Sequence, residues 1–263
     1  MHRSLVVTVL VFSYLAPVQA QEDIELYFPN VVSGRIGPEL VFNNVFVFAN
    51  DGDQDVQIPF EVLTNEGLPA EEDLFDVAAG EVESFGGYSW MPFLWPAAPR
   101  EVQGWARIRL AEASAVRARQ NLTVRNYDSF KVLAAANTKA VAAGTVFQVT
   151  LPDVVTWFDP IHAMAIVNPS SQDSAEVTIA FTFHGAGTLT PYLANCQTEI
   201  AAPPLHRVTR FLQDDLCERG PQRGWPPAQL DLTLSSDQPI AVSVMEFSPS
   251  TSGFSDLEVR KLQ

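Results

Sequence analysis

The chain repeats itself once along its length, and this repeat limits what it can fold into more than any other feature. Residues 28–32 (FPNVV) match residues 151–155 (LPDVV), and residues 45–51 match residues 164–169. The same register continues through three further matches: 105–110 with 229–234, 115–124 with 240–247, and 129–132 with 253–257. Each copy spans about 110 residues, the size of one small domain. We therefore predict two copies of one unit, produced by duplication of a gene segment.

Apolar and polar residues alternate along the matched segments. Residues 56–62 (VQIPFEV) and 177–183 (VTIAFTF) show the alternation most clearly. A period of two is typical of a half-buried strand. Turn residues stand at the ends of the matched segments 45–51 and 164–169. They are Asn50-Asp51-Gly52-Asp53 and Asn168-Pro169-Ser170-Ser171. About seven short strands per unit predict an all-β chain of two tandem immunoglobulin-like β-sandwiches.

Residues 1–20 have the organisation of a signal peptide. Arg3 precedes an apolar run from Leu5 to Leu15, and Val18 and Ala20 stand where signal peptidase requires small residues. We predict cleavage after Ala20 and an exported protein, periplasmic or extracellular. No later stretch reaches the roughly 18 apolar residues of a membrane span, so none is expected in the mature chain.

The two units are assigned to residues 21–133 and 146–263. Residues 134–145 between them are rich in Ala, show little periodicity and are predicted to form a linker. The second unit also contains one candidate for a short helix, from Thr209 to Leu216, because Phe211, Leu212 and Leu216 have helical spacing. We expect that helix to pack on a sheet edge.

Composition and motifs argue against several functions. The 263 residues carry a formal net charge of -15, from 16 Lys and Arg against 31 Asp and Glu, so nucleic acid is not an expected partner. Motifs of serine hydrolases, zinc proteases and nucleotide-binding loops do not occur in the sequence. We expect no enzymatic activity and no cofactor. His162, His184 and His206 could in principle ligate one metal, but are interpreted as ordinary surface or edge residues.

The two cysteines, Cys196 and Cys217, both lie in the second unit. In an oxidising compartment we expect them to form a disulfide, which would close a loop of about 20 residues and contribute about 3 kcal/mol. A metal pair and two free thiols are the alternatives. Their spacing lacks the close Cys-x-x-Cys pattern of a zinc site.

Residues 88–96 (YSWMPFLWP) are the first candidate for a binding surface. Their two prolines argue against a central strand, so the segment is predicted to be a loop that carries the rings of Tyr88, Trp90, Phe93 and Trp95. Such rings could stack on sugar faces, form a protein interface, or fold back over the open end of the sandwich.

Four arginines are the second candidate. Arg107 and Arg109 alternate with apolar residues, and Arg117 and Arg119 repeat the arrangement on the next predicted strand. We predict that the four guanidinium groups share one exposed sheet face, which could bind an anionic glycan or an acidic partner. The alternative is that Glu61 and its acidic neighbours pair with them internally.

The acidic turn at residues 51–55 (DGDQD) resembles a calcium loop in its alternation. It lacks the glycine and the final glutamate of an EF-hand, so Asp51, Asp53 and Asp55 are a weak calcium candidate. The matching residues of the second unit are Ser170-Ser171-Gln172-Asp173, which favours an ordinary hairpin turn in both units.

Six short motifs follow one another along the mature chain: Phe28-Pro29, Gly104-Trp105-Ala106-Arg107, Asn168-Pro169, Arg210-Phe211-Leu212, Thr233-Leu234-Ser235-Ser236 and Pro239-Ile240-Ala241-Val242. Together they resemble an uncharacterised family of exported bacterial tandem β-sandwich proteins. The resemblance covers nearly the whole mature chain and implies an immunoglobulin-like tandem without implying an activity or site residues. The chain departs from that pattern where Asn50-Asp51 replaces the first Asn-Pro turn, and in the aromatic residues 88–95.

These observations lead to one expected function and one alternative. We expect a non-catalytic exported protein that serves extracellular or cell-surface recognition or assembly, with a protein, a glycan or another copy of itself as partner. The alternative is an extracellular carbohydrate-binding module or a weakly marked glycan-active hydrolase. Fold alone does not decide between them.

Overall fold

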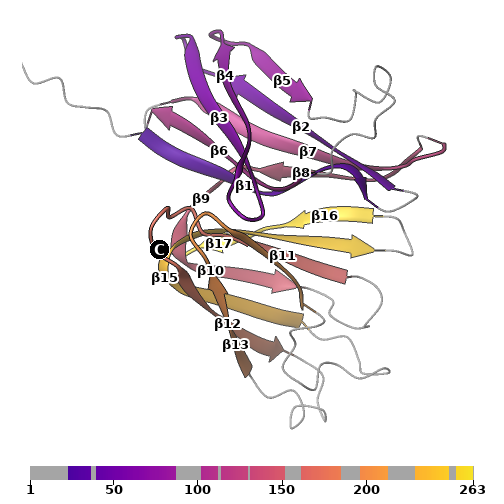
Figure 1. Ribbon diagram of the computed structural model, residues 1–263, viewed down its shortest axis with the longest axis vertical. Helices are drawn as coiled ribbons and strands as arrows, with labels where there is room; N and C mark the ends of the chain where they lie inside the picture. Colours follow the sequence, from indigo (N-terminus) through magenta and orange to yellow (C-terminus); the bar gives the residue numbers. More distant parts are fainter. Residues whose placement is uncertain are drawn as a thin grey trace, which may run out of the picture.

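The computed structural model describes residues 23–36, 40–86, 102–111, 114–129, 131–151, 161–184, 196–212, 229–248 and 253–262. Within these ranges the secondary-structure elements are β-strands in two antiparallel sheets, one from each half of the chain (Figure 1). The all-β prediction is confirmed. We refer below to residues 23–142 as the first half and to residues 144–262 as the second half.

The first sheet contains nine described strands. They are β1 (Asp23–Ile36), β2 (Leu40–Asn50), β3 (Val56–Thr64), β4 (Pro69–Val77), β5 (Val82–Gly86), β6 (Val102–Ala111), β7 (Val116–Asn126), β8 (Val132–Lys139) and β9 (Val141–Ala142). Their order is β4-β3-β6-β1-β2-β7-β8, and in addition β5 pairs with β2 and β9 pairs with β1.

The second sheet contains eight described strands. They are β10 (Gly144–Leu151), β11 (Ile161–Val167), β12 (Ala175–His184), β13 (Cys196–Ala202), β14 (Arg207–Phe211), β15 (Gln229–Ser248), β16 (Gly253–Leu257) and β17 (Arg260–Lys261). Their order is β13-β12-β15-β10-β17, while β11 pairs with both β14 and β15, and β16 pairs with β15.

Each sheet folds over on itself and encloses a core of its own. In the first half, β1 pairs with β6 along most of its length and with β2 at its end. Apolar side chains of β3 and β6 therefore pack against those of β2 and β7. Phe46 of β2 and Phe60 of β3 meet with ring centroids 4.8 Å apart, in the edge-to-face arrangement that aromatic pairs prefer. The long strand β15 joins the two layers of the second half in the same way.

Most strand pairings of the first half recur in the second, whereas the pairing of β1 with β2 has no counterpart between β10 and β11 among the described residues. Strands β10, β11, β12, β13 and β14 take the places of β1 to β5, and β15 takes the places of both β6 and β7. The register agrees with the sequence matches as well. Phe28 is paired with Ala106, and the matching residues Leu151 and Leu230 are also paired. These pairings and this one matched pair are common to the two halves.

A buried asparagine stands at the end of the second strand of each half: Asn50 is the last residue of β2, and Asn168 directly follows β11. Asn50 is 1% exposed and Asn168 is 0% exposed. The Asn50 amide donates a hydrogen bond of 3.0 Å to the carbonyl of Val77, and the Asn168 amide donates one of 2.8 Å to the carbonyl of Ala202. Each side-chain oxygen accepts a bond from the backbone N–H two residues later. The same side chain therefore fixes the same turn in both halves.

Replacing either asparagine should have an effect of the same size. We expect Asn50→Leu and Asn168→Leu each to lower the free energy of unfolding by about 2–3 kcal/mol, because buried backbone groups lose their partners. Urea denaturation measures both values. Asn137→Leu on the exposed face of β8 is the control and should change stability by less than about 0.5 kcal/mol. A loss no larger than that of the control would show that these amides do not hold the turns.

Two local predictions differ from the structure. Residues 134–145, predicted to form a linker, instead belong mostly to β8, β9 and the start of β10, because every second residue of β8 from Ala134 onward is buried against the rest of the fold. The predicted helix from Thr209 to Leu216 is wrong at its beginning, since residues 209–211 are strand and pair with residues 163–165 of β11. Strand pairing outweighs the weak helical spacing there. Residues 213–216 lie outside the described part of the chain.

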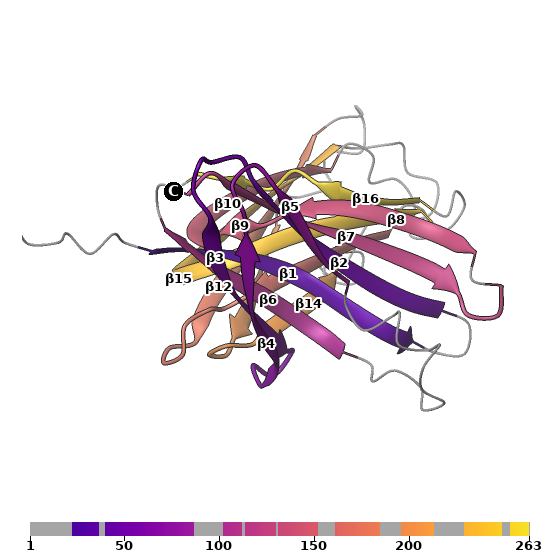
Figure 2. The same ribbon diagram turned by 90° about the horizontal axis from the view of Figure 1, so that it is seen from above.

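The two halves are in direct contact. Strand β16 lies along β8, and β1 and β9 pack on β11 and β15 (Figure 1 and Figure 2). Apolar side chains from both halves meet in two buried groups, which we call the junction: Tyr27, Leu63, Trp105, Val167 and Ala241 in one, and Leu122, Ala136 and Met245 in the other. The junction fixes how one half sits on the other.

Candidate functional site

Three sequence predictions fall outside the described residues. They are the signal peptide at residues 1–20, the segment with the rings of Tyr88, Trp90, Phe93 and Trp95, and Cys217. Cys196 begins β13 and packs against the core of the second half. Its disulfide with Cys217 stays a prediction.

The four arginines do not share one face. Arg107 and Arg109 lie on β6, which pairs with β1 and β3. Arg117 and Arg119 lie on β7, which pairs with β2 and β8. The chain passes from one layer of the folded sheet to the other between β6 and β7 instead of forming a hairpin. The prediction of a single anion-binding face is therefore wrong.

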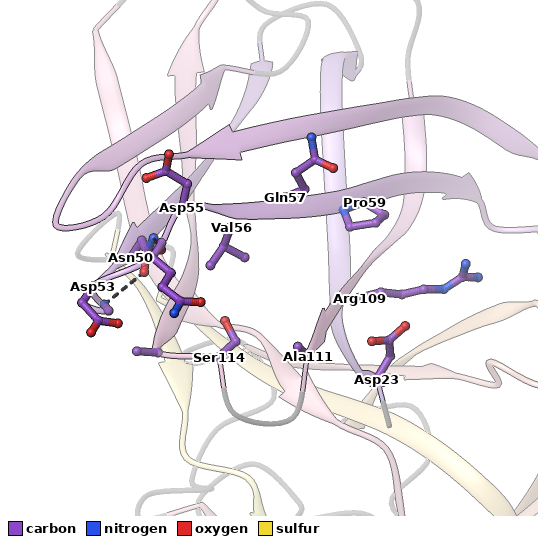
Figure 3. A pocket seen from close by; sticks show the side chains of 13 residues that line it. Asp23, Asn50, Asp53, Asp55, Val56, Gln57, Pro59, Arg109, Ala111 and Ser114 are labelled. Atoms are coloured by element: carbon purple, nitrogen blue, oxygen red, sulfur yellow. Dashed lines mark hydrogen bonds between the residues drawn. The ribbon is translucent and has the colours of Figure 1, made fainter. Parts of the chain in front are cut away.

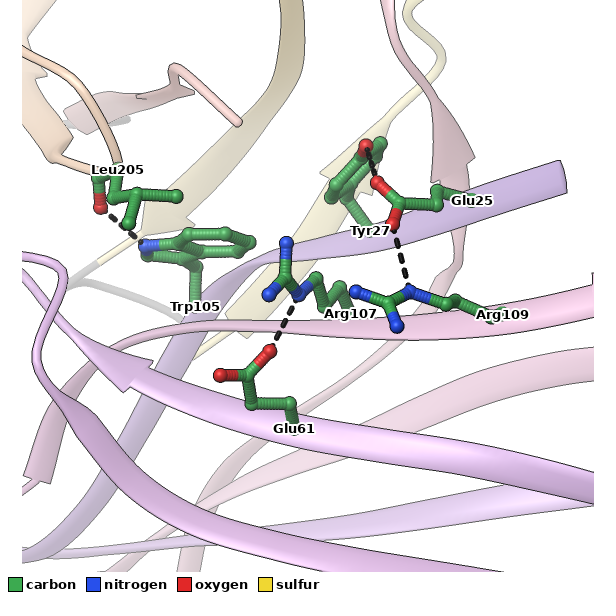
Figure 4. Close-up of polar contacts among 7 residues, drawn as sticks. All are labelled: Glu25, Tyr27, Glu61, Trp105, Arg107, Arg109 and Leu205. Atoms are coloured by element: carbon green, nitrogen blue, oxygen red, sulfur yellow. Dashed lines mark hydrogen bonds and ion pairs between the residues drawn. The ribbon is translucent and has the colours of Figure 1, made fainter. Parts of the chain in front are cut away.

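The arginines of β6 are held by carboxylates (Figure 4). Arg107 Nε lies 2.5 Å from Glu61 Oε2, and Arg109 Nε lies 2.9 Å from Glu25 Oε1. Tyr27 donates a hydrogen bond of 2.6 Å to the other oxygen of Glu25. Burial raises the pKa of Glu25, but the bonds from Tyr27 and Arg109 outweigh it and leave the pKa below its usual value. This face is a network of internal pairs, as the alternative interpretation expected.

The weak calcium candidate is broken up by other contacts. Arg117 binds both carboxylate oxygens of Asp51, and this hydrogen bonding lowers the pKa of Asp51. Asp55 accepts a hydrogen bond of 3.0 Å from the backbone N–H of Ala79. In the described ranges, no group of three or more His, Cys, Asp or Glu side chains is placed to hold a metal ion.

A pocket of about 640 Å³ opens at the end of the first half, beside the acidic turn (Figure 3). Asp23, Asp53, Asp55 and Arg109 contribute its charged groups. The carboxylates of Asp53 and Asp55 point away from one another (Figure 3). The pocket is therefore polar, but its charges do not converge on one point.

The three histidines are also apart. His162 on β11 is 1% exposed, and its Nε2 lies 3.1 Å from a carboxylate oxygen of Glu246. His184 lies 2.7 Å from Asp231, and His206 Nδ1 lies 2.8 Å from a backbone carbonyl in its own turn. Each imidazole thus has a partner of its own.

Acidification should destabilise the second half through His162. Burial lowers the pKa of its imidazole, although Glu246 acts in the opposite direction. The pKa of histidine in the unfolded chain is about 6.5. The contribution of His162 to the free energy of unfolding is therefore fully present above that pH. It decreases below that pH, by at most about 1.4 kcal/mol per pH unit for one proton. Urea denaturation at about pH 7.5 and about pH 5 measures this loss. His162→Gln should remove it, and an equal loss in the variant would contradict the assignment to His162.

Arg207 of β14 crosses the junction and is 8% exposed. Its Nη2 donates to Asn30 Oδ1 at 2.8 Å, and its Nη1 donates to Asn65 Oδ1 at 3.0 Å. Burial lowers the pKa of Arg207 to about 10, so the guanidinium still carries its proton at neutral pH. The cation of the second half is thus held by neutral amides of the first half.

Trp105 crosses the junction from the other side. It is 0% exposed, and its indole N–H donates a hydrogen bond of 3.0 Å to the carbonyl of Leu205 in the second half (Figure 4). Gly67, in the turn between β3 and β4, lies against the same leucine. Side chain and backbone of both halves therefore interlock at Leu205.

The junction also contains a cleft of about 510 Å³, which we call the junction cleft. Asn30, Gln120 and Thr138 line it from the first half, and Ser243 lines it from the second. These four side chains are at most 8% exposed. Asn30 Nδ2 donates to Ser243 Oγ at 2.6 Å, Thr138 donates to Gln120 Oε1 at 3.1 Å, and Gln120 donates to the backbone carbonyl of Asn30.

Arg207 and the polar residues of this cleft were not predicted from the sequence. Each is a single polar residue within or beside a strand, and its burial depends on how the halves meet. The bond that Trp105 makes across the junction has no local signal in the sequence. The sequence repeat makes a contact between two units an expected feature, but it does not show which residues form that contact.

Comparisons with known proteins identify no family. No protein-family model matches the chain, and no curated protein matches it. Among solved structures, the chain is similar to one described as Thermotoga maritima 1070, with a TM-score of 0.33 and 12% sequence identity. That match covers 45% of this chain and 93% of the other. In the described ranges no helix is long and apolar enough to cross a membrane.

Proposed function

We propose that this chain is a non-catalytic exported protein that acts in recognition or assembly at the cell surface. In this proposal a signal peptide, residues 1–20, precedes two immunoglobulin-like β-sandwich units that arose by tandem duplication. The common order of strand pairings supports the duplication, as do the matched pairs Phe28–Ala106 and Leu151–Leu230. The shared turns at Asn50 and Asn168 support it further.

The junction is the observation that carries the proposal. Buried side chains from both halves, among them Trp105 and Arg207, hold the two units in one arrangement. A surface that is fixed before binding loses less conformational freedom when a partner docks. The guanidinium groups of Arg107, Arg109 and Arg117 also form ion pairs within the first half. A rigid body of this kind is suited to presenting a recognition surface.

The proposed partner is a protein or glycan at the cell surface, or another copy of this chain. The second candidate function is a carbohydrate-binding role, and the junction cleft is the observation that favours it, because uncharged donors and acceptors gather there. Neither role requires a cofactor.

Production of the full chain in a bacterium tests the export. We expect to find the protein outside the cytoplasm, with the mass of a chain that begins at Gln21. An Ala20→Arg variant should keep its signal peptide. A cytoplasmic chain with residues 1–20 intact would contradict the export.

The recognition part is tested on the mature chain, residues 21–263. Light scattering follows self-association, and arrays of immobilised glycans and surface proteins follow binding. A Trp90→Ala/Trp95→Ala variant tests the ring-bearing segment as the contact. A mature chain that stays monomeric and binds nothing on these arrays would contradict a role in recognition or assembly.

A further inference from the structure

We infer that the junction cleft binds a neutral sugar. The inference rests on the proposed recognition function and names the class of ligand recognised. The cleft of about 510 Å³ falls within the roughly 300–1,000 Å³ of small-molecule sites, which often lie between domains. Both halves contribute walls, from β1, β7 and β8 on one side and from β15 and β16 on the other. The site therefore exists only when the junction is formed.

The deep part of the cleft carries amides and hydroxyls rather than charges. Asn30, Gln120, Thr138 and Ser243 line it, and their mutual hydrogen bonds hold their positions before a ligand arrives. Ser243 accepts a bond from Asn30, and its own proton has no acceptor among the described residues. That hydroxyl can donate to a ligand. Groups that both donate and accept are suited to sugar hydroxyls, which do the same.

Arg207 lies behind this floor and acts as a positioning residue. Its Nη2 donates to Asn30 Oδ1 at 2.8 Å, while Asn30 Nδ2 donates onward to Ser243. A cation bound to the amide oxygen polarises the amide and strengthens its N–H as a donor. The orientation of Ser243 at the cleft is thus fixed from the core outward.

Charged groups occur only at the mouth among the described lining residues. Lys139, Asp256 and Glu258 are exposed there. A free amino acid or a phosphate compound would need charged partners in the deep part, whereas a neutral sugar needs none. Apolar lining from Leu257 and Val259, which are partly exposed, can cover the C–H faces of a sugar ring. These features together favour a neutral sugar over a charged metabolite.

The test is a titration of the mature chain with four probes: glucose, galactose, mannose and N-acetylglucosamine. Saturation-transfer NMR detects contact, and calorimetry gives the dissociation constant, which we expect in about the millimolar range for one small sugar. Ser243→Ala should weaken binding about tenfold, because it removes the free donor. Asn137→Ala, at the exposed mouth on β8, should weaken it about threefold and serves if Ser243→Ala does not fold. Gln57→Ala, in the pocket at the end of the first half, is the control and should bind as the unmodified chain does.

Several results would overturn the inference. They are no saturation transfer to any of the four sugars, unchanged affinity in both cleft variants, or binding of glycine or inorganic phosphate in place of the sugars. Self-association or binding to surface proteins in the earlier test would then leave the proposed function standing without this ligand. A chain that fails both tests loses the proposed function as well.

Discussion

Trp105→Ala is expected to lower the free energy of unfolding by about 3–5 kcal/mol, since it empties a large site in the middle of the junction. Trp105 is 0% exposed and packs among Tyr27 and Leu63 of its own half and Val167 and Ala241 of the other. Its indole N–H also donates a hydrogen bond of 3.0 Å to a carbonyl of the second half, and the variant loses this bond. The variant should therefore lose stability and loosen the contact between the halves.

Two measurements follow this variant. Urea denaturation gives the stability change, and small-angle X-ray scattering should show a larger radius of gyration. Trp105→Phe is the matched control, because it keeps most of the apolar contact and removes the hydrogen bond, at a cost of about 1–2 kcal/mol. A Trp105→Ala protein that loses less than about 1 kcal/mol and keeps its dimensions would show that this residue does not hold the halves together.

Gly67→Ala is expected to cost about 2–5 kcal/mol, from strain in its own backbone and from crowding across the junction. Gly67 has a φ of 76°, which L-residues rarely adopt. An added Cβ would lie 2.6 Å from the Cβ of Leu205 and 2.7 Å from its carbonyl oxygen. The leucine cannot move freely, because that same oxygen accepts the bond from Trp105.

Gly80→Ala separates the two causes. Gly80 has a φ of 73°, and a Cβ there would meet nothing within 4 Å. This variant carries the backbone strain alone and should cost about 1–2 kcal/mol. Equal losses in Gly67→Ala and Gly80→Ala, measured by urea denaturation, would contradict a tight contact at Leu205.

The strands could be predicted because alternation is a local property of the sequence. The matched segments that contain Phe28 and Leu151, and those that contain Ala106 and Leu230, are strands in both halves. Each half-buried strand must place every second side chain in the core, so the alternation of apolar and polar residues can be recognised in each strand separately. The all-β class follows from that signal.

The predictions of a linker at residues 134–145 and of a single arginine face were wrong for a different reason. Ala134 and Ala136 alternate with exposed residues in β8, but small side chains give a weak periodic signal. The placement of Arg107 and Arg117 depends on whether the chain between β6 and β7 turns back or crosses to the other layer. Spacing along the sequence is the same in both cases. Only the pairings of β6 with β3 and of β7 with β8 decide it.

The junction lay beyond sequence reasoning because its residues come from distant parts of the chain. Arg207 meets Asn30 and Asn65 only after both halves have folded and docked. A lone arginine at the start of a strand looks like a surface residue in the sequence. The cleft and the sugar site inferred from it depend on that docking as well.

Differential scanning calorimetry of the mature chain, residues 21–263, tests most directly whether the two halves form one body. The buried junction of Trp105, Arg207 and Gly67 predicts a single cooperative transition, with equal calorimetric and van't Hoff enthalpies. Trp105→Ala should split or broaden that transition. Two separate transitions in the unmodified chain, at different temperatures, would contradict the account, because each half would then unfold independently of the other.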